Sequence, residues 1–112
     1  LDGSGNWSNS MRASVNGSLQ SSPWLYCVSQ DQTAAITSYA FSSTSYTKVL
    51  AVLSCFVMEP PADSSGCMNT YGFGSSQTAF GIGSDNKTVT VKMKGGGTIA
   101  SGSRIVLILL VI

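Results

Sequence analysis

The chain has 112 residues, of which 43% are hydrophobic and only 10% charged, whereas about 25% are charged in an average globular domain. Its formal net charge is +1 and it contains no histidine. This composition argues against charge-driven disorder and against electrostatic binding of nucleic acid. The absence of histidine excludes serine–histidine and cysteine–histidine catalytic pairs and histidine metal sites. The length fits one domain, and we expect residues 1–112 to form it.

The first ten residues, LDGSGNWSNS, are polar and are expected to form a flexible or docking arm. They lack the basic start and apolar stretch of a secretory signal, and no methionine precedes them, so we expect a processed protein or an excised fragment. Trp7 has no apolar neighbour in this arm. It is therefore expected to be a docking anchor for another chain or an exposed stacking platform.

Strand patterns follow along the first half of the chain. Apolar and polar residues alternate from Met11 to Val15, and the pattern ends at the turn pair Asn16-Gly17. Trp24–Val28 is a second short run, and Ala35–Phe41 is a third. No window shows the 3.6-residue periodicity of an amphipathic helix.

The segment Thr47–Met58 is apolar on both faces of the strand that it predicts. Strict alternation places Val49, Ala51, Leu53, Cys55 and Val57 on one face and Leu50, Val52, Phe56 and Met58 on the other. A second sheet, a folded-over loop or another subunit must cover the second face. Glu59-Pro60-Pro61 should end the strand, because proline donates no ladder hydrogen bond.

The second half predicts four more strands. Two short ones, Tyr71–Gly74 and Thr78–Gly83, precede a polar turn at residues 84–87. Thr88–Lys94 alternates between polar and apolar residues, so it should form a hairpin with the strand before the turn. Arg104–Ile112 is again apolar on both faces. Its apolar run is far shorter than the roughly 20 residues of a spanning helix, so no transmembrane helix is expected.

About seven strands separated by turn residues, without helices, predict an all-β fold, an antiparallel β-sandwich of jelly-roll-like type. Two strands with two apolar faces are more than a small sandwich needs. We therefore expect a homo-oligomer, although a long loop over one central strand is an alternative.

The three cysteines do not suggest a disulfide framework, because their number is odd. Cys27 and Cys55 lie within apolar runs and are expected to be buried thiols. Cys67 follows a glycine in a turn-like stretch, with no basic residue nearby to activate it.

No constellation of catalytic or metal-binding residues stands out. Glu59 and Asp63 are the only close carboxylate pair, and the prolines between them predict two solvated loop acids. The turn at residues 84–87 offers too few oxygen ligands for calcium, and the glycine-rich stretches match no phosphate-binding motif. We expect no catalytic residue, no metal and no cofactor.

Aromatic residues are the better candidates for binding. Tyr71 and Phe73 are flanked by Asn69 and by hydroxyl-bearing residues, a combination on which a sugar ring could stack and form hydrogen bonds. Packing at the edge of the core is the alternative for both rings. The candidate ligand-binding residues are therefore Tyr71, Phe73, Asn69 and Trp7.

The stretch Asn86–Ile112, NKTVTVKMKGGGTIASGSRIVLILLVI, joins an amphipathic strand through a glycine-rich link to a terminal hydrophobic strand. In this it resembles the C-terminal tip domains of trimeric bacteriophage tail fibres. The resemblance implies a β-structured homotrimer on the virion surface, whose distal loops contact a host glycan or an outer-membrane protein. It implies no particular binding residue, and the repeats of a fibre shaft are missing.

Two further functions remain open. An extracellular filament subunit could complete a neighbour's sheet with its terminal strand or with the arm around Trp7. A secreted carbohydrate-binding module would use the same aromatic residues, whereas a glycan-active enzyme would need the missing carboxylate pair. The mass in solution separates a closed trimer from polymers of varied length.

Overall fold

The protein is an all-β sandwich, as the strand patterns predict. The computed structural model describes residues 13–20, 22–61, 69–71 and 78–112. These residues form nine strands and a short 3-10 turn, Lys94–Gly96, and contain no α-helix. The strands are β1 (Ala13–Val15), β2 (Ser18–Gln20), β3 (Trp24–Asp31), β4 (Tyr39–Phe41), β5 (Val49–Glu59), β6 (Asn69–Tyr71), β7 (Thr78–Ile82), β8 (Val89–Met93) and β9 (Arg104–Val111).

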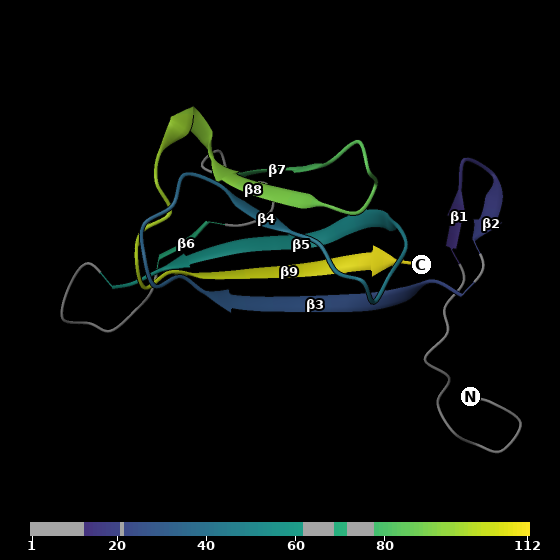
Figure 1. The fold of residues 1–112 in the computed structure, drawn as a ribbon, viewed down its shortest axis with the longest axis horizontal. Coiled ribbons are helices and arrows are strands. Elements are labelled where there is room, and N and C mark those ends of the chain that lie inside the picture. The colour runs from purple at the N-terminus through teal and green to yellow at the C-terminus, as the bar shows by residue number, and fades with distance from the viewer. Residues whose placement is uncertain (1–12, 21, 62–68, 72–77) are drawn as a thin grey trace, which may run out of the picture.

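Two antiparallel sheets make up the sandwich. One has the strand order β3-β9-β5-β6 and the other the order β4-β8-β7. The strands β1 and β2 form a separate hairpin, which lies beyond one end of the sandwich in Figure 1. Asn16 and Gly17 both have positive φ angles there, which is the backbone that the predicted turn pair favours.

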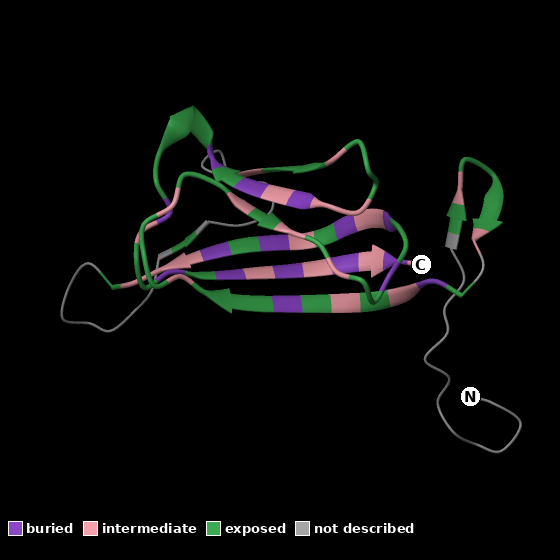
Figure 2. Cartoon of the chain, in the orientation of Figure 1, coloured by how far each residue is buried: buried purple, intermediate pink, exposed green. Residues whose placement is uncertain are grey.

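The core lies between the two sheets, and β9 shows why. Its residues Ile105, Leu107, Leu109 and Val111 are fully buried, whereas the residues between them are only half-buried, so burial alternates along the strand in Figure 2. From the facing sheet, β8 contributes buried residues to the same core. The rings of Tyr26 on β3 and Phe41 on β4 lie 5.7 Å apart and join the two layers.

Backbone hydrogen bonds close both ends of the sandwich. At one end the amide of Thr47 donates to the carbonyl of Ile112 at 2.8 Å, which holds the start of β5 against the end of β9. At the other end Ile36 and Ile99 exchange two backbone hydrogen bonds of 3.0 and 2.7 Å. The predicted strand Ala35–Phe41 is accordingly shorter, because Ile36 forms only this isolated bridge and the strand begins at Tyr39.

Two register shifts in β5 overturn the strict alternation that the sequence predicts. They fall between Val49 and Ala51 and between Val52 and Ser54. Each shift places one extra residue in β5 opposite β9, so the faces exchange. Val49, Val52, Cys55 and Val57 are consequently all buried on the core side, although Val52 was expected on the opposite face. The strand ends at Glu59, before the two prolines, as predicted.

The predicted hairpin at residues 84–87 is confirmed, since β7 and β8 pair over five residue pairs. Asp85 organises its turn. One carboxylate oxygen accepts hydrogen bonds from the amides of Lys87 and Thr88, both at 2.9 Å, and the other accepts one from the Thr88 hydroxyl at 2.6 Å. The side chain thus satisfies donors that the turn leaves without a ladder partner.

Candidate functional site

Of the four candidate binding residues, the structure describes the backbone of two. Asn69 and Tyr71 lie on β6, a three-residue edge strand. Their backbones pair with Glu59 and Val57 at the end of β5. Phe73 and Trp7 lie outside the described residues, as do residues 1–10 of the expected arm. The structure therefore brings Asn69 and Tyr71 onto one strand, where the sequence predicts only the second of them to lie.

A row with three polar members crosses the sheet beside these two residues. Pairing across the four strands aligns Asp31, Arg104, Met58 and Thr70. Arg104 Nε donates to Asp31 Oδ1 at 2.6 Å and Arg104 Nη2 donates to Asp31 Oδ2 at 3.3 Å. The hydrogen bond from Arg104 lowers the pKa of Asp31, and the same contact raises the pKa of Arg104. Sequence reasoning missed this pair because 73 residues separate its members.

The two aspartates with described surroundings are held in the ionised form. Hydrogen bonds from Thr88, and then from the Lys87 amide, hold the pKa of Asp85 at about 2. The pKa of Asp31 is likewise below its ordinary value. Neither carboxyl group holds a proton near neutral pH, so neither is suited to act as a general acid there. Within the described ranges, no cluster of three or more histidine, cysteine, aspartate or glutamate residues could hold a metal ion.

The side of the four-stranded sheet that faces away from the core is apolar. We call it the outer apolar face and define it by Leu25 and Cys27 of β3, Phe56 of β5, and Ile108 and Leu110 of β9. Leu25 is 46% exposed and Phe56 37%, and the two β9 residues are half-buried. Leu53, in the second bulge of β5, is also exposed. Figure 2 shows the mixed burial of these strands.

Cys27 corrects one prediction, because it is exposed on the outer apolar face and is not buried in the core. An apolar run on an edge strand indicates burial only for the residues that face the second sheet. Cys55 confirms the same prediction, since it is buried, and burial raises its pKa to about 11. Both thiols are free. Cys67 lies outside the described residues.

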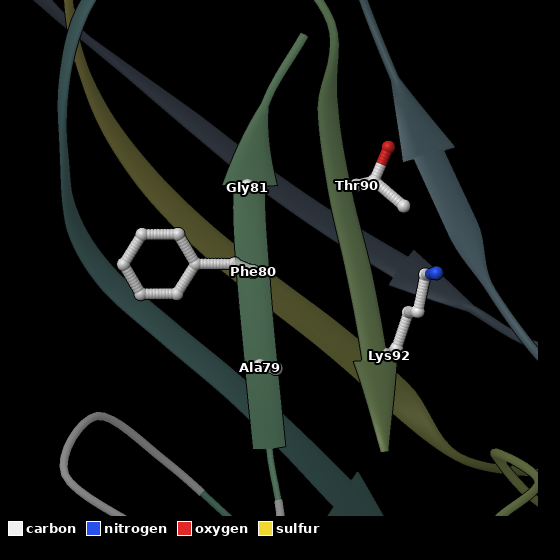
Figure 3. A pocket seen from close by; sticks show the side chains of 5 residues that line it. All are labelled: Ala79, Phe80, Gly81, Thr90 and Lys92. Carbon is white, nitrogen blue, oxygen red and sulfur yellow. The ribbon is translucent and has the colours of Figure 1, made fainter. Parts of the chain in front are cut away.

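The opposite sheet has an open hollow of about 300 Å³ over β7 and β8. Figure 3 shows Thr90 and Lys92 on one side, with the Phe80 ring pointing away from them. The remaining lining residues, Ala79 and Gly81, are small. The hollow therefore has one aromatic lining residue, Phe80, whose ring lies on the side away from Lys92.

Comparison with family models, with curated proteins and with solved structures finds no match to the chain. Among the described residues, no helix has the length and apolar character needed to cross a bilayer. Two surfaces of the chain are candidates for a function, namely the outer apolar face and the end of the sheet that carries β6.

Proposed function

We propose that this chain is a non-catalytic, self-associating attachment domain of a virion surface or another extracellular surface, with a homotrimer as the preferred assembly. The single observation that carries the proposal is the outer apolar face. A sheet face with an exposed leucine on β3 and an exposed phenylalanine on β5, the two strands that flank β9, is costly in water, and association removes it from solvent. The low net charge of +1 opposes such association only weakly.

The attachment site is proposed at the end of the sheet that carries β6. Asn69 and Tyr71 lie there next to the row that contains the Asp31–Arg104 ion pair. This end is opposite to the C-terminus in Figure 1, so assembly along the sheet leaves loop residues free to meet a receptor. A host glycan or an outer-membrane protein is the proposed receptor, contacted by Tyr71, Phe73 and Asn69, with Trp7 as a second contact.

A non-enzymatic role is supported by the chemistry of the ionisable groups. The chain has no histidine to act as a general base. The carboxylates of Asp31 and Asp85 are both engaged by hydrogen bonds from residues of their own fold. Binding by side-chain contact needs none of the proton transfers that hydrolysis requires.

An extracellular filament is the second candidate, and one specific observation favours it. Strand β3 is an edge strand of eight residues, and no strand of the described chain pairs with its outer side. Its only charged residue is Asp31, so it has little of the charge that protects exposed edges. A neighbour's strand could extend the sheet there, which would produce polymers of varied length.

Binding by variants tests the attachment site. Tyr71→Ala and Phe73→Ala should each weaken binding of the full chain to a glycan array or to bacterial outer-membrane vesicles by about tenfold or more, as loss of an aromatic contact does. Thr90→Ala, on the far sheet, is the control and should bind like the unaltered chain. Unchanged binding by both aromatic variants, with the oligomer intact, would refute the site assignment.

The mass in solution tests the assembly. Light scattering should give a closed oligomer, and a trimer is expected. Polymers of varied length would favour the filament instead. A monomer that still binds glycans would favour a secreted carbohydrate-binding module.

A further inference from the structure

We infer that the outer apolar face is the contact surface between copies of this chain, covered in the assembly by the same face of its neighbours. This inference rests on the proposed self-association and adds the surface that mediates it. The occupant is a further copy of the chain, and the contact is sheet face against sheet face, distinct from pairing at the free edge of β3.

The pairing of the strands shows how continuous the apolar surface is. Cys27, Ile108 and Ser54 form a row across β3, β9 and β5, and the next row towards the C-terminus joins Leu25, Leu110 and Ala51. These rows contain no charged side chain. On this side of the three strands, the charged side chains are those of Asp31 and Arg104 in the end row, and these two form an ion pair. The surface thus has an uncharged, mainly apolar centre and a charged end, the composition of an interface core with its rim.

The size of the face reaches the lower limit of what a specific contact needs. Three strands spaced by about 4.8 Å, with eight residues rising about 3.3 Å each, cover roughly 350 Å² in plan. Because side chains make each face uneven, its accessible area is larger than its plan area. Two such faces pressed together bury on the order of 1,000 Å², which is the lower bound for a specific protein interface.

The width of the face also suits three copies. Three faces about 14 Å wide enclose a triangular prism in which each sheet lies about 4 Å from the axis. That distance is close to half the roughly 10 Å that separates stacked sheets, so one layer of side chains from each copy would fill the interior. In this arrangement the free edge of β3 also lies against a neighbouring copy.

A further copy is a better occupant than a chemically different partner. The centre of the face offers apolar side chains, one thiol and the Ser54 hydroxyl, with no charge to select a charged ligand. Sheet faces pack best against other pleated apolar faces, and the described residues of each copy form one such face. The outward side of the other sheet carries Ala40, Thr90 and Lys92, so it is not an alternative.

Two lysine substitutions, one on each outward side of the sandwich, test whether the outer apolar face is the contact surface. Ile108→Lys places an ammonium at the middle of the outer apolar face, and Thr90→Lys places one on the central strand of the opposite sheet. Sedimentation equilibrium on the full chain should show that Ile108→Lys weakens association by about 100-fold or more, because the charge would be buried without a partner. Thr90→Lys should keep the association of the unaltered chain, and circular dichroism should show the same β signature for both variants.

Thiol labelling of the unaltered chain provides a second readout that does not depend on a variant. Cys27 lies on the face and is exposed in the single chain, whereas Cys55 is buried in the core. Labelling followed by peptide mass spectrometry should show the Cys27 rate falling about tenfold or more from dilute to concentrated protein. Cys55 should remain slow at both concentrations, which makes it the internal control.

The outcomes separate the two proposals. If the chain associates but Cys27 labels equally fast at both concentrations, or if folded Ile108→Lys associates like the unaltered chain, the face is not the interface and only this inference fails. If the unaltered chain stays monomeric at about 100 µM, the proposed self-association fails as well. Should Ile108→Lys not fold, the Cys27 rates decide the question.

Discussion

The two outward sides of the sandwich differ in chemistry although both belong to antiparallel sheets. On the four-stranded sheet, the central strand β9 presents Val106, Ile108 and Leu110 outward. On the three-stranded sheet, the central strand β8 presents Thr90 and Lys92. In any β-strand every second side chain points to the outer side of its sheet. The difference between the two outward sides therefore comes from the types of residue and not from strand geometry.

A strand with two apolar faces, such as β9, differs from a strand that meets water on one side. A sheet that meets water on one side alternates apolar and polar residues, as β8 does. In β9 every residue after Arg104 is apolar, yet only alternate residues are buried in the single chain. The second apolar set is therefore only half-buried in the single chain.

The largest expected effect distinguishes the two sides of β9 itself. Leu107→Ala empties a fully buried site and should lower the free energy of unfolding by about 2–5 kcal/mol. Ile108→Ala, at the neighbouring position, should lower the free energy of unfolding of the dilute protein by less than about 1.5 kcal/mol, because the side chain of Ile108 faces outward. Urea unfolding monitored by circular dichroism measures both. An equal cost for the two variants in the monomer would mean that the chain itself covers the outer apolar face.

A smaller effect concerns the solvent dependence of assembly. Contact through an uncharged face should be insensitive to screening, so the dissociation constant should change less than about threefold between 50 and 500 mM sodium chloride. Sulfate at the same ionic strength should tighten association, because it strengthens apolar burial. Sedimentation equilibrium gives both values. A steep loss of association with sodium chloride would show that charged residues hold the copies together.

The smallest expected effect concerns the turn between β7 and β8 and depends on pH. The folded-state pKa of Asp85 is about 2, below its ordinary value of 3.8, so its ionised form stabilises the fold. This stabilisation is fully present above about pH 4 and is lost as the pH falls towards 2. Asp85→Asn should therefore be less stable than the unaltered chain at pH 6, with the difference shrinking towards pH 2. Urea unfolding curves of both proteins at pH 6 and pH 2 measure this difference in stability. An equal difference at the two pH values would contradict the assignment of the stabilisation to the ionised Asp85 carboxylate.

Much of the fold could be predicted from local patterns. The turn pair Asn16-Gly17, the turn at residues 84–87 and the strand end before Pro60 all follow from residue chemistry, and all three are confirmed. The burial of Cys27 was predicted wrongly, because an apolar run does not reveal that its strand lies at the edge of a sheet. The two bulges in β5 were also missed, since extra residues in a ladder depend on the partner strand.

Less of the candidate site could be predicted. The sequence places Tyr71 and Phe73 in one aromatic stretch, but their role in binding stays a prediction. The Asp31–Arg104 pair beside β6 has no local signal, because it arises only when β3 and β9 come together. Residues distant in sequence become neighbours through strand order, and no periodicity encodes that order.

By itself, the sequence determined that this protein is all-β, that its charge is low and that two of its strands are apolar on both faces, because these properties depend on composition and on a two-residue period. Only the tertiary structure decided which apolar set of β9 faces the core and which lies outward beside Cys27. The physical reason is that burial is a property of packed sheets: the second sheet covers one side of β9, and the choice of side depends on strand pairing across the whole chain.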